Sequence, residues 1–290
     1  MKLRYLLPAV LLVATAGCDS ILDVKPSTTV TTEDAIVNPN SARAAQAGLY
    51  DALQSTSYYG GDFVIFMDLS SDNVQHSCTF TTFADAEGLQ LTADNTTVRA
   101  IWNATYRTIG RSNTLIARIP GVTLLDATES ADIIGQAQAI RALAYFDLVK
   151  VWGTSGAGGG VPIRLTPALT IADVANVTRA DTSAVYTQIF ADLTAAQAKI
   201  TNTNPSRATV RFVRALRSKV ALYRQQWAVA RDEAAAAMVG VSLAPTYQAL
   251  FTADGTRTTE DIFRLAFTDQ DAMNLGFYYL TRGLGGRREV

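Results

Sequence analysis

The spacing of apolar residues predicts a mostly helical protein, and the pattern is clearest in residues 135–153. Two apolar stripes in this stretch recur at intervals of three or four residues: Ala137, Ile140, Ala144, Leu148 and Val151, and Ala142, Tyr145, Val149 and Trp152. These intervals fit an α-helix. A helix that is apolar on two faces is usually packed from two sides. We therefore expect an inner helix with Tyr145, Leu148 and Trp152 buried, ended by Gly153 in a left-handed conformation.

Apolar stripes elsewhere predict further helices, at residues 39–54, 98–119, 182–200, 205–224 and 227–239. Asn38 before Pro39, and Asp181 before the third of these helices, are typical helix starts. The last two helices are joined by a short corner that ends in Trp227, an arrangement that resembles a tetratricopeptide-type helical hairpin. The stripe of its first helix is expected to point inward: Phe212, Leu216, Val220 and Tyr223.

Two long stretches break the helical pattern, residues 55–97 and residues 163–180. The first is rich in Ser, Thr, Gly, Asp and aromatic residues, with one apolar run at 63–66 that we expect to be buried. An irregular excursion of this length is uncommon unless it has a function. Residues 258–267 alternate imperfectly between apolar and polar positions, which predicts a strand. The fold class is therefore mostly α, a helical array with long irregular loops and a minor β component.

Composition narrows the possible functions. The chain has 290 residues, enough for a large core, and its 25 basic and 26 acidic residues give no basic footprint for nucleic acid. Cys18 and Cys78 are the only cysteines and His76 is the only histidine, so neither a disulfide framework nor a zinc site can be built. The glycine-rich tract 156–160 lacks the Gly-Lys-Ser/Thr of a phosphate loop. We expect no enzymatic activity, no cofactor and no metal site.

The N-terminus has the features of a lipoprotein. Residues 1–17 combine a basic start, a short apolar run and small residues before Cys18, as in a bacterial lipoprotein signal peptide. In that reading Cys18 becomes the mature N-terminus and carries two or three acyl chains, palmitate among them, which give durable membrane attachment. The alternative is an ordinary signal peptide followed by a chance cysteine. Residues 18–38 contain Pro26 and many β-branched residues, which predicts an extended tether.

Residues 135–162 resemble a motif of the SusD/RagB family. Its members show Glu-Ala-x-aromatic-Leu-Arg-Ala-x-x-Tyr-Phe-x-Leu-x-x-x-aromatic-Gly-Gly-Val-Pro, and the following positions of this chain match: Ala137, Ile140, Arg141, Ala142, Tyr145, Phe146, Leu148, Trp152, Gly153, Val161 and Pro162. Gln136 and Ala139 depart from it, and residues 154–159 lengthen the turn. Trp102, Tyr106, Ile109 and Asn113 fit a second family pattern, and Cys18-x-x-x-Leu-Asp-x-x-Pro26 resembles its mature N-terminus.

The resemblance implies a tetratricopeptide-like helical array over residues 39–290, which would lack the usual C-terminal part of the family. It also implies a lipid-anchored protein on the outward face of the outer membrane. Such a protein works with a TonB-dependent, SusC-like transporter and captures an oligosaccharide or other nutrient. The alternative is a lipid-anchored helical scaffold that binds only proteins. No nucleic acid is expected as a partner.

Residues of the irregular excursion are the candidates for ligand contact. Sugars are bound by aromatic faces and by amide or carboxylate groups, and this stretch offers Asp72, Asn73, His76, Phe80, Phe83 and Asn95. A structural role is the competing interpretation for several of them. The two phenylalanines would then anchor the loop, and Asp72 and Asn73 would form a turn.

Overall fold

The computed structural model describes residues 35–290, except positions 72, 78, 171, 176, 252–257, 269–271 and 289–290 and the side chain of Val174. The predicted signal peptide, Cys18 and most of the tether lie outside the described residues. The α-helices are, in chain order, α3 (Pro39–Gln54), α4 (Asp62–Leu69), α5 (Thr81–Glu87), α6 (Thr96–Arg118), α7 (Ala127–Trp152), α8 (Thr182–Lys199), α9 (Val210–Tyr223), α10 (Trp227–Met238) and α11 (Leu275–Tyr279).

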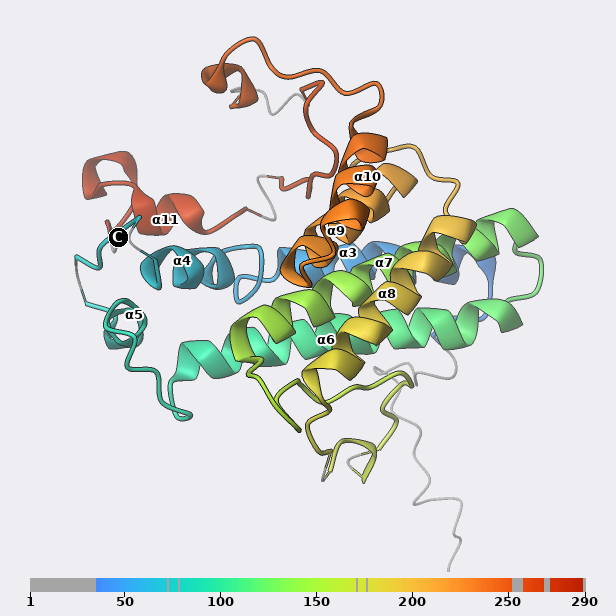
Figure 1. Cartoon of the computed structure of the whole chain (residues 1–290), viewed down its shortest axis with the longest axis horizontal. Helices are drawn as coiled ribbons and strands as arrows, with labels where there is room; N and C mark the ends of the chain where they lie inside the picture. The colour runs from blue at the N-terminus through green and yellow to red at the C-terminus, as the bar shows by residue number, and fades with distance from the viewer. Residues whose placement is uncertain are drawn as a thin grey trace, which may run out of the picture. The chain divides into compact units, whose positions relative to one another are not determined.

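Helix α7 is the centre of the helical array, as its two apolar stripes predict. Helices α6 and α8 both pack along it, and the three run side by side in Figure 1. Tyr145 and Leu148 are completely buried between these neighbours, whereas Trp152, at the end of α7, is only half-buried. The inner helix is thus confirmed, and the burial predicted for Trp152 is reached only in part.

Both ends of α7 differ from the prediction. The helix begins well before residue 135, because the Asp126 carboxylate accepts hydrogen bonds from the backbone N–H groups of Thr128 and Glu129 and caps the first turn. Gly153 ends the helix with φ −76° and ψ 141°, so it is not left-handed. The glycine is required for a different reason. A Cβ at this position would lie 2.2 Å from the carbonyl oxygen of Val149.

A sealed polar cluster joins α6, α7 and α8. Arg141 donates from Nε and Nη2 to the two carboxylate oxygens of Asp192, over 2.9 and 2.6 Å, and from Nη1 to Oδ1 of Asn113 over 2.8 Å. The Asn113 amide then donates to the carbonyl oxygens of Arg164 and Thr166. All three side chains of this Arg141 cluster are buried and all are hydrogen-bonded, which is the usual condition for buried polar groups.

The excursion between α3 and α6, residues 55–95, contains two short helices that the sequence analysis did not predict. Helix α4 includes the apolar run at 63–66, of which Phe63, Ile65 and Phe66 are buried as expected. The turn before it is fixed to the core, because the hydroxyls of Tyr58 and Tyr59 both donate to Oδ2 of Asp147 over 2.6 Å.

The α9–α10 hairpin is present, although its first helix starts later than predicted. Residues 205–208 form a turn in which the side-chain oxygen of Asn204 accepts from the backbone N–H of Ser206. The helix begins after Thr209, whose hydroxyl accepts from the backbone N–H of Phe212. Helix α9 packs on α10 and also on α8, which extends the layered array.

The strand predicted at residues 258–267 is not formed, so this prediction was wrong. Residues 259–260 form a turn and residue 262 a bend, and no strand is assigned within the segment; Thr268, just after it, takes part in an isolated β-bridge. Its backbone groups find other partners. The Arg264 N–H donates to the Pro205 carbonyl, and the Ala266 carbonyl accepts from the Gln54 side chain. Within the described parts of residues 35–290, no helix is long and apolar enough to cross a membrane.

Candidate functional site

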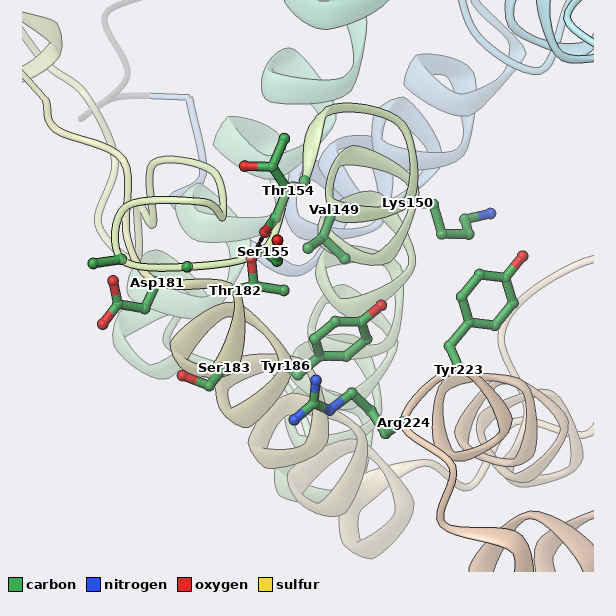
Figure 2. Close-up of a pocket in the computed structure, with 13 residues that line it drawn as sticks. Val149, Lys150, Thr154, Ser155, Asp181, Thr182, Ser183, Tyr186, Tyr223 and Arg224 are labelled. Carbon is green, nitrogen blue, oxygen red and sulfur yellow. Dashed lines mark hydrogen bonds between the residues drawn. The ribbon is translucent and has the colours of Figure 1, made fainter.

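An open cavity of about 710 Å³ lies where the end of α7, the glycine-rich segment 153–157 and the start of α8 meet. The end of α9 completes its wall (Figure 2). We call this space the α7–α8 cavity. Its volume lies within the range of about 300–1,000 Å³ found for small-ligand pockets. It is therefore large enough to hold part of an oligosaccharide.

The glycine-rich segment takes a defined path along the cavity. Gly156 and Gly158 have φ values of 97° and 65°, a left-handed conformation that glycine adopts at little cost. The segment is fixed to the start of α8 by two hydrogen bonds. The Thr182 hydroxyl donates to the Thr154 carbonyl over 2.7 Å, and the Gly158 N–H donates to Oδ1 of Asp181 over 2.7 Å. Asp181 stands at the predicted N-cap position, but its side chain bonds the loop and not the first turn of α8.

Aromatic rings and two cations form the opposite wall. Tyr223 is 54% exposed, and its ring packs edge-on against Phe146 with centroids 5.1 Å apart. The Arg224 guanidinium lies 4.8 Å from the ring centroid of Tyr186. Lys150 Nζ lies 4.7 Å above the Phe146 ring. Figure 2 shows Tyr223, Lys150, Tyr186 and Arg224 grouped on one side of the cavity.

Buried groups behind this wall hold Lys150 in place. Its Nζ lies 2.9 Å from Oδ1 of Asp147, the same carboxylate that accepts from Tyr58 and Tyr59. Burial raises the pKa of both tyrosine hydroxyls well above the usual value, so they remain donors to Asp147. Burial also raises the pKa of Tyr186, which keeps its hydroxyl protonated at the cavity.

The inward position predicted for the Tyr223 side chain was wrong. Its position in the apolar stripe of α9 predicts an inward side chain, yet more than half of it is exposed at the cavity. The stripe continues inward at Phe212, Leu216 and Val220, which are buried. Periodicity identifies the face of a helix, but Tyr223 is the last residue of α9 and lies where the neighbouring helices no longer cover that face.

The polar residues predicted to contact a ligand are dispersed along the excursion. Asn73 is exposed, and Asp72 lies outside the described residues. His76 is half-buried, and its backbone N–H donates to Glu87. Asn95 is buried and caps α6, since its side-chain oxygen accepts from the N–H groups at the start of that helix. Their contact with a ligand stays a prediction.

The two predicted aromatic residues anchor the excursion to the C-terminal segment. Phe83 is buried, with its ring centroid 5.4 Å from those of Phe80 and Tyr278. Phe80 is half-buried, and the Arg287 guanidinium lies 5.3 Å from its ring. This arrangement matches the loop-anchoring role that the sequence analysis weighed for both phenylalanines.

Two other cavities have walls that suit a sugar less well. One of about 480 Å³ is bounded by Trp102, Tyr106 and Asn113. Its Tyr106 hydroxyl already donates to the Pro162 carbonyl, and the Asn113 amide is used within the Arg141 cluster. The other, of about 440 Å³, is lined mainly by apolar side chains such as Phe212 and Phe263. The α7–α8 cavity combines the exposed ring of Tyr223 with hydroxyls and charges, which is the mixture that sugar binding requires.

Sequence reasoning missed the side chains that form this wall, because they come from three separate parts of the chain. Lys150 lies in the last turn of α7, and Tyr186 lies in the first turns of α8. Tyr223 is the last residue of α9, and Arg224 is its C-cap. None of them belongs to a short motif. The only local signal was the lengthened glycine-rich tract, which marks an unusual connection between two helices.

Comparison with known proteins gives consistent matches. A SusD-like family model, described as "starch-binding associating with outer membrane", matches residues 21–223. The chain is 29% identical over 189 residues to SusD-like protein P38 of Formosa agariphila, an alignment that covers 64% of this chain and 35% of that protein. It is 22% identical over 240 residues to SusD-like protein P25 of the same organism, covering 78% of this chain and 44% of P25.

Solved structures with similar folds agree with these sequence matches. A laminarin-binding SusD-like protein superimposes with a TM-score of 0.70 at 26% identity, over 80% of this chain and 52% of that one. A SusD superfamily protein from Bacteroides vulgatus superimposes with a TM-score of 0.75 at 15% identity, over 90% of this chain and 56% of that one. The chain thus spans about half of the length of these structures and less than half of the two curated relatives.

Proposed function

Since the chain belongs to the SusD-like family, we propose that it binds an oligosaccharide at the outer membrane and takes part in nutrient uptake without catalysing a reaction. The observation that carries the proposal is the α7–α8 cavity, where the half-exposed ring of Tyr223 stands beside hydroxyl and charged groups. A sugar ring can stack on Tyr223 while its hydroxyls bond to the polar side chains around it.

Titration of the full chain with laminari- and malto-oligosaccharides tests this proposal. Tyr223→Ala removes the stacking surface and should weaken binding by about 0.5–1.5 kcal/mol, the usual contribution of an aromatic pair. The matched control is Tyr247→Ala, which deletes another exposed tyrosine outside the cavity and should leave affinity unchanged. Equal losses of saccharide affinity in both variants would show that the cavity is not the binding site. If the chain bound no saccharide at all, the proposed function would be refuted.

Attachment to the membrane through Cys18 is a separate part of the proposal. The pattern before Cys18 supports it, because small residues follow a short apolar run there. Cys18→Ser should release the protein into the soluble fraction of the cells, whereas the unchanged chain should sediment with outer membranes. A variant that stays with the membranes would show that the anchor lies elsewhere.

We also propose a TonB-dependent, SusC-like transporter as the partner that receives the sugar, by analogy with the family. Co-purification of this chain with the transporter from detergent extracts of the native cells tests this partnership. The Cys18→Ser form serves as a control for co-localisation at the membrane. A chain that is recovered without any TonB-dependent protein under conditions that preserve other outer-membrane complexes would contradict it.

The excursion is proposed as a further contact surface for a longer saccharide. Asn73 is its best probe, because the side chain is exposed and Asn73→Ala should not disturb the fold. Asp72, His76, Phe80, Phe83 and Asn95 complete the proposed set. Weaker binding of long but not of short oligosaccharides to Asn73→Ala would support this assignment, and unchanged binding of both would oppose it.

A scaffold that binds only proteins remains the second candidate, and exposed apolar side chains on the α9–α10 hairpin favour it. Trp227, Met238 and Val239 are between 60% and 71% exposed. Trp227 starts α10, and Met238 and Val239 lie at its end. Single exposed apolar residues are common on protein surfaces, and larger apolar patches mark interaction sites. The saccharide titration separates the two candidates, because a scaffold would bind no sugar.

A further inference from the structure

Charge is distributed unevenly along the α7–α8 cavity. Lys150 lies on the side of Tyr223 and the Arg224 side chain extends to Tyr186, and Figure 2 shows the Asp181 carboxylate at the far end of the cavity, pointing away from them. The middle is lined by the hydroxyls of Thr182 and Ser183. One end of the cavity is thus cationic and the other end offers a carboxylate and neutral hydroxyls.

The two cations differ in whether a carboxylate of the protein is paired with them. Lys150 is paired with the buried Asp147, so it compensates a charge of the fold. Arg224 is exposed and lies against the face of Tyr186, and the described residues place no carboxylate within ion-pair distance of its guanidinium. A guanidinium without a carboxylate partner has N–H groups along its edge that can bind a carboxylate or a sulfate in a bidentate manner.

We propose that the α7–α8 cavity selects an acidic oligosaccharide, with one carboxylate or sulfate group of the sugar bound by Arg224. This inference rests on the proposed saccharide binding and adds the class of sugar. A neutral sugar ring of the oligosaccharide stacks on Tyr223. The next sugar ring offers its hydroxyls to Asp181 at the far end of the cavity. The anionic group contributes a charge-assisted bond that a neutral sugar cannot make.

The test compares paired sugars that differ only in charge. Calorimetric titrations of the full chain use an oligogalacturonate and its carboxyl-reduced form in one arm, and a sulfated galactan oligosaccharide and its desulfated form in the other. The acidic member of at least one pair should bind about tenfold more tightly than its neutral counterpart, as one charge-assisted hydrogen bond implies. The pair that shows the preference identifies the anionic group. The preference should shrink when salt is raised from about 20 to about 200 mM.

Two variants assign the preference to Arg224. Arg224→Gln should abolish the preference, so that the acidic and neutral members of each pair bind with equal affinity, and it should leave the fold intact because its backbone bonds at the end of α9 remain. Lys219→Gln is the matched control, since it removes one exposed positive charge from the same helix at a position outside the cavity, and it should preserve the preference.

The outcomes separate this inference from the function on which it rests. Equal affinity for the acidic and neutral members of both pairs would overturn acidic selection while leaving saccharide binding in place. A preference that survives in Arg224→Gln would also overturn it. Absence of binding to every acidic and neutral sugar would refute the proposed function itself, and acidic selection with it.

Discussion

The middle and the end of α7 differ in whether their charged side chains are buried or open to solvent. In the middle, Arg141 is buried, and Nε, Nη1 and Nη2 of its guanidinium all donate to Asp192 or Asn113. At the end, Lys150 lies at an open cavity together with Arg224 of the α9 C-terminus, and within the described part of the chain only Lys150 of these two has a carboxylate partner. The same helix therefore carries one polar cluster that is closed to solvent and one that is open to it.

This difference separates a structural role from a binding role. The Arg141 cluster ties α6 and α8 to α7 and fixes the loop at Arg164 and Thr166. Its groups cannot reach a ligand without breaking bonds inside the protein. The cavity at the end of α7 also receives Arg224 and the exposed ring of Tyr223 from the end of α9, whose polar groups can bond to a ligand. Changes in the middle should therefore affect stability, and changes at the end should affect binding.

The largest effect is expected from Arg141→Met. The variant leaves the Asp192 carboxylate buried without its partner, and loss of one member of a buried pair costs about 3–5 kcal/mol in the free energy of unfolding. Urea denaturation measures this change. A double variant, Arg141→Met with Asp192→Leu, should recover part of the loss because no unpaired charge remains. A loss below about 1 kcal/mol for the single variant would show that the cluster is accessible to water.

Leu148→Ala probes the apolar core between these two clusters. Leu148 is completely buried on α7, so we expect a loss of about 2–5 kcal/mol in the free energy of unfolding. Leu222→Ala is the matched control on α9, where the side chain is 52% exposed and the expected loss is below about 0.5 kcal/mol. Similar values for the two variants would contradict the packing of α7 from two sides.

Thr182→Val tests the open end with a smaller effect. The variant removes the hydrogen bond from the Thr182 hydroxyl to the Thr154 carbonyl, which we expect to lower the free energy of unfolding by about 0.5–1.5 kcal/mol. The glycine-rich segment should also lose its fixed position, so saccharide affinity should fall. Thermal unfolding and titration of the same preparation measure both. An unchanged affinity would mean that this segment does not form part of the binding site.

The smallest effect is expected for the surface pair of Arg43 and Glu129. The side-chain hydrogen bond from Arg43 lowers the pKa of Glu129, so the folded carboxyl is deprotonated more readily than the unfolded one. The contribution to stability is therefore present above the unfolded pKa and is lost as the pH falls through the folded pKa. Arg43→Gln should lower the melting temperature slightly at neutral pH and not at a pH below both pKa values. A difference that persists in acid would exclude this explanation.

The sequence predicts the helical layers well because their signal is local. The stripes of α7 and the cap of α3 depend on residues three or four positions apart, and such patterns survive in the folded chain. The predicted strand at 258–267 was wrong because its hydrogen bonds depend on Pro205 and Gln54, which are distant in sequence. Long-range partners of this kind leave no local pattern.

The candidate site was harder to predict for the same reason. The end of α7, the start of α8 and the end of α9 meet only in the folded chain, so Lys150, Tyr186 and Tyr223 share no motif. The excursion was identified by its unusual composition, and the structure then gave Phe83 and Asn95 clear structural contacts. Composition showed where the helical pattern stops, but not which side chains remain exposed.

Hydrogen–deuterium exchange with and without a bound oligosaccharide tests the central comparison most directly. We predict slower exchange in peptides that cover residues 153–157, 182–186 and 222–225, which surround the α7–α8 cavity. Peptides that cover Arg141 and Asp192 should exchange at the same rate in both states, since the sealed cluster meets no ligand. Protection confined to residues 73–95, with no change around the cavity, would place the saccharide on the excursion and contradict the account of the open end of α7.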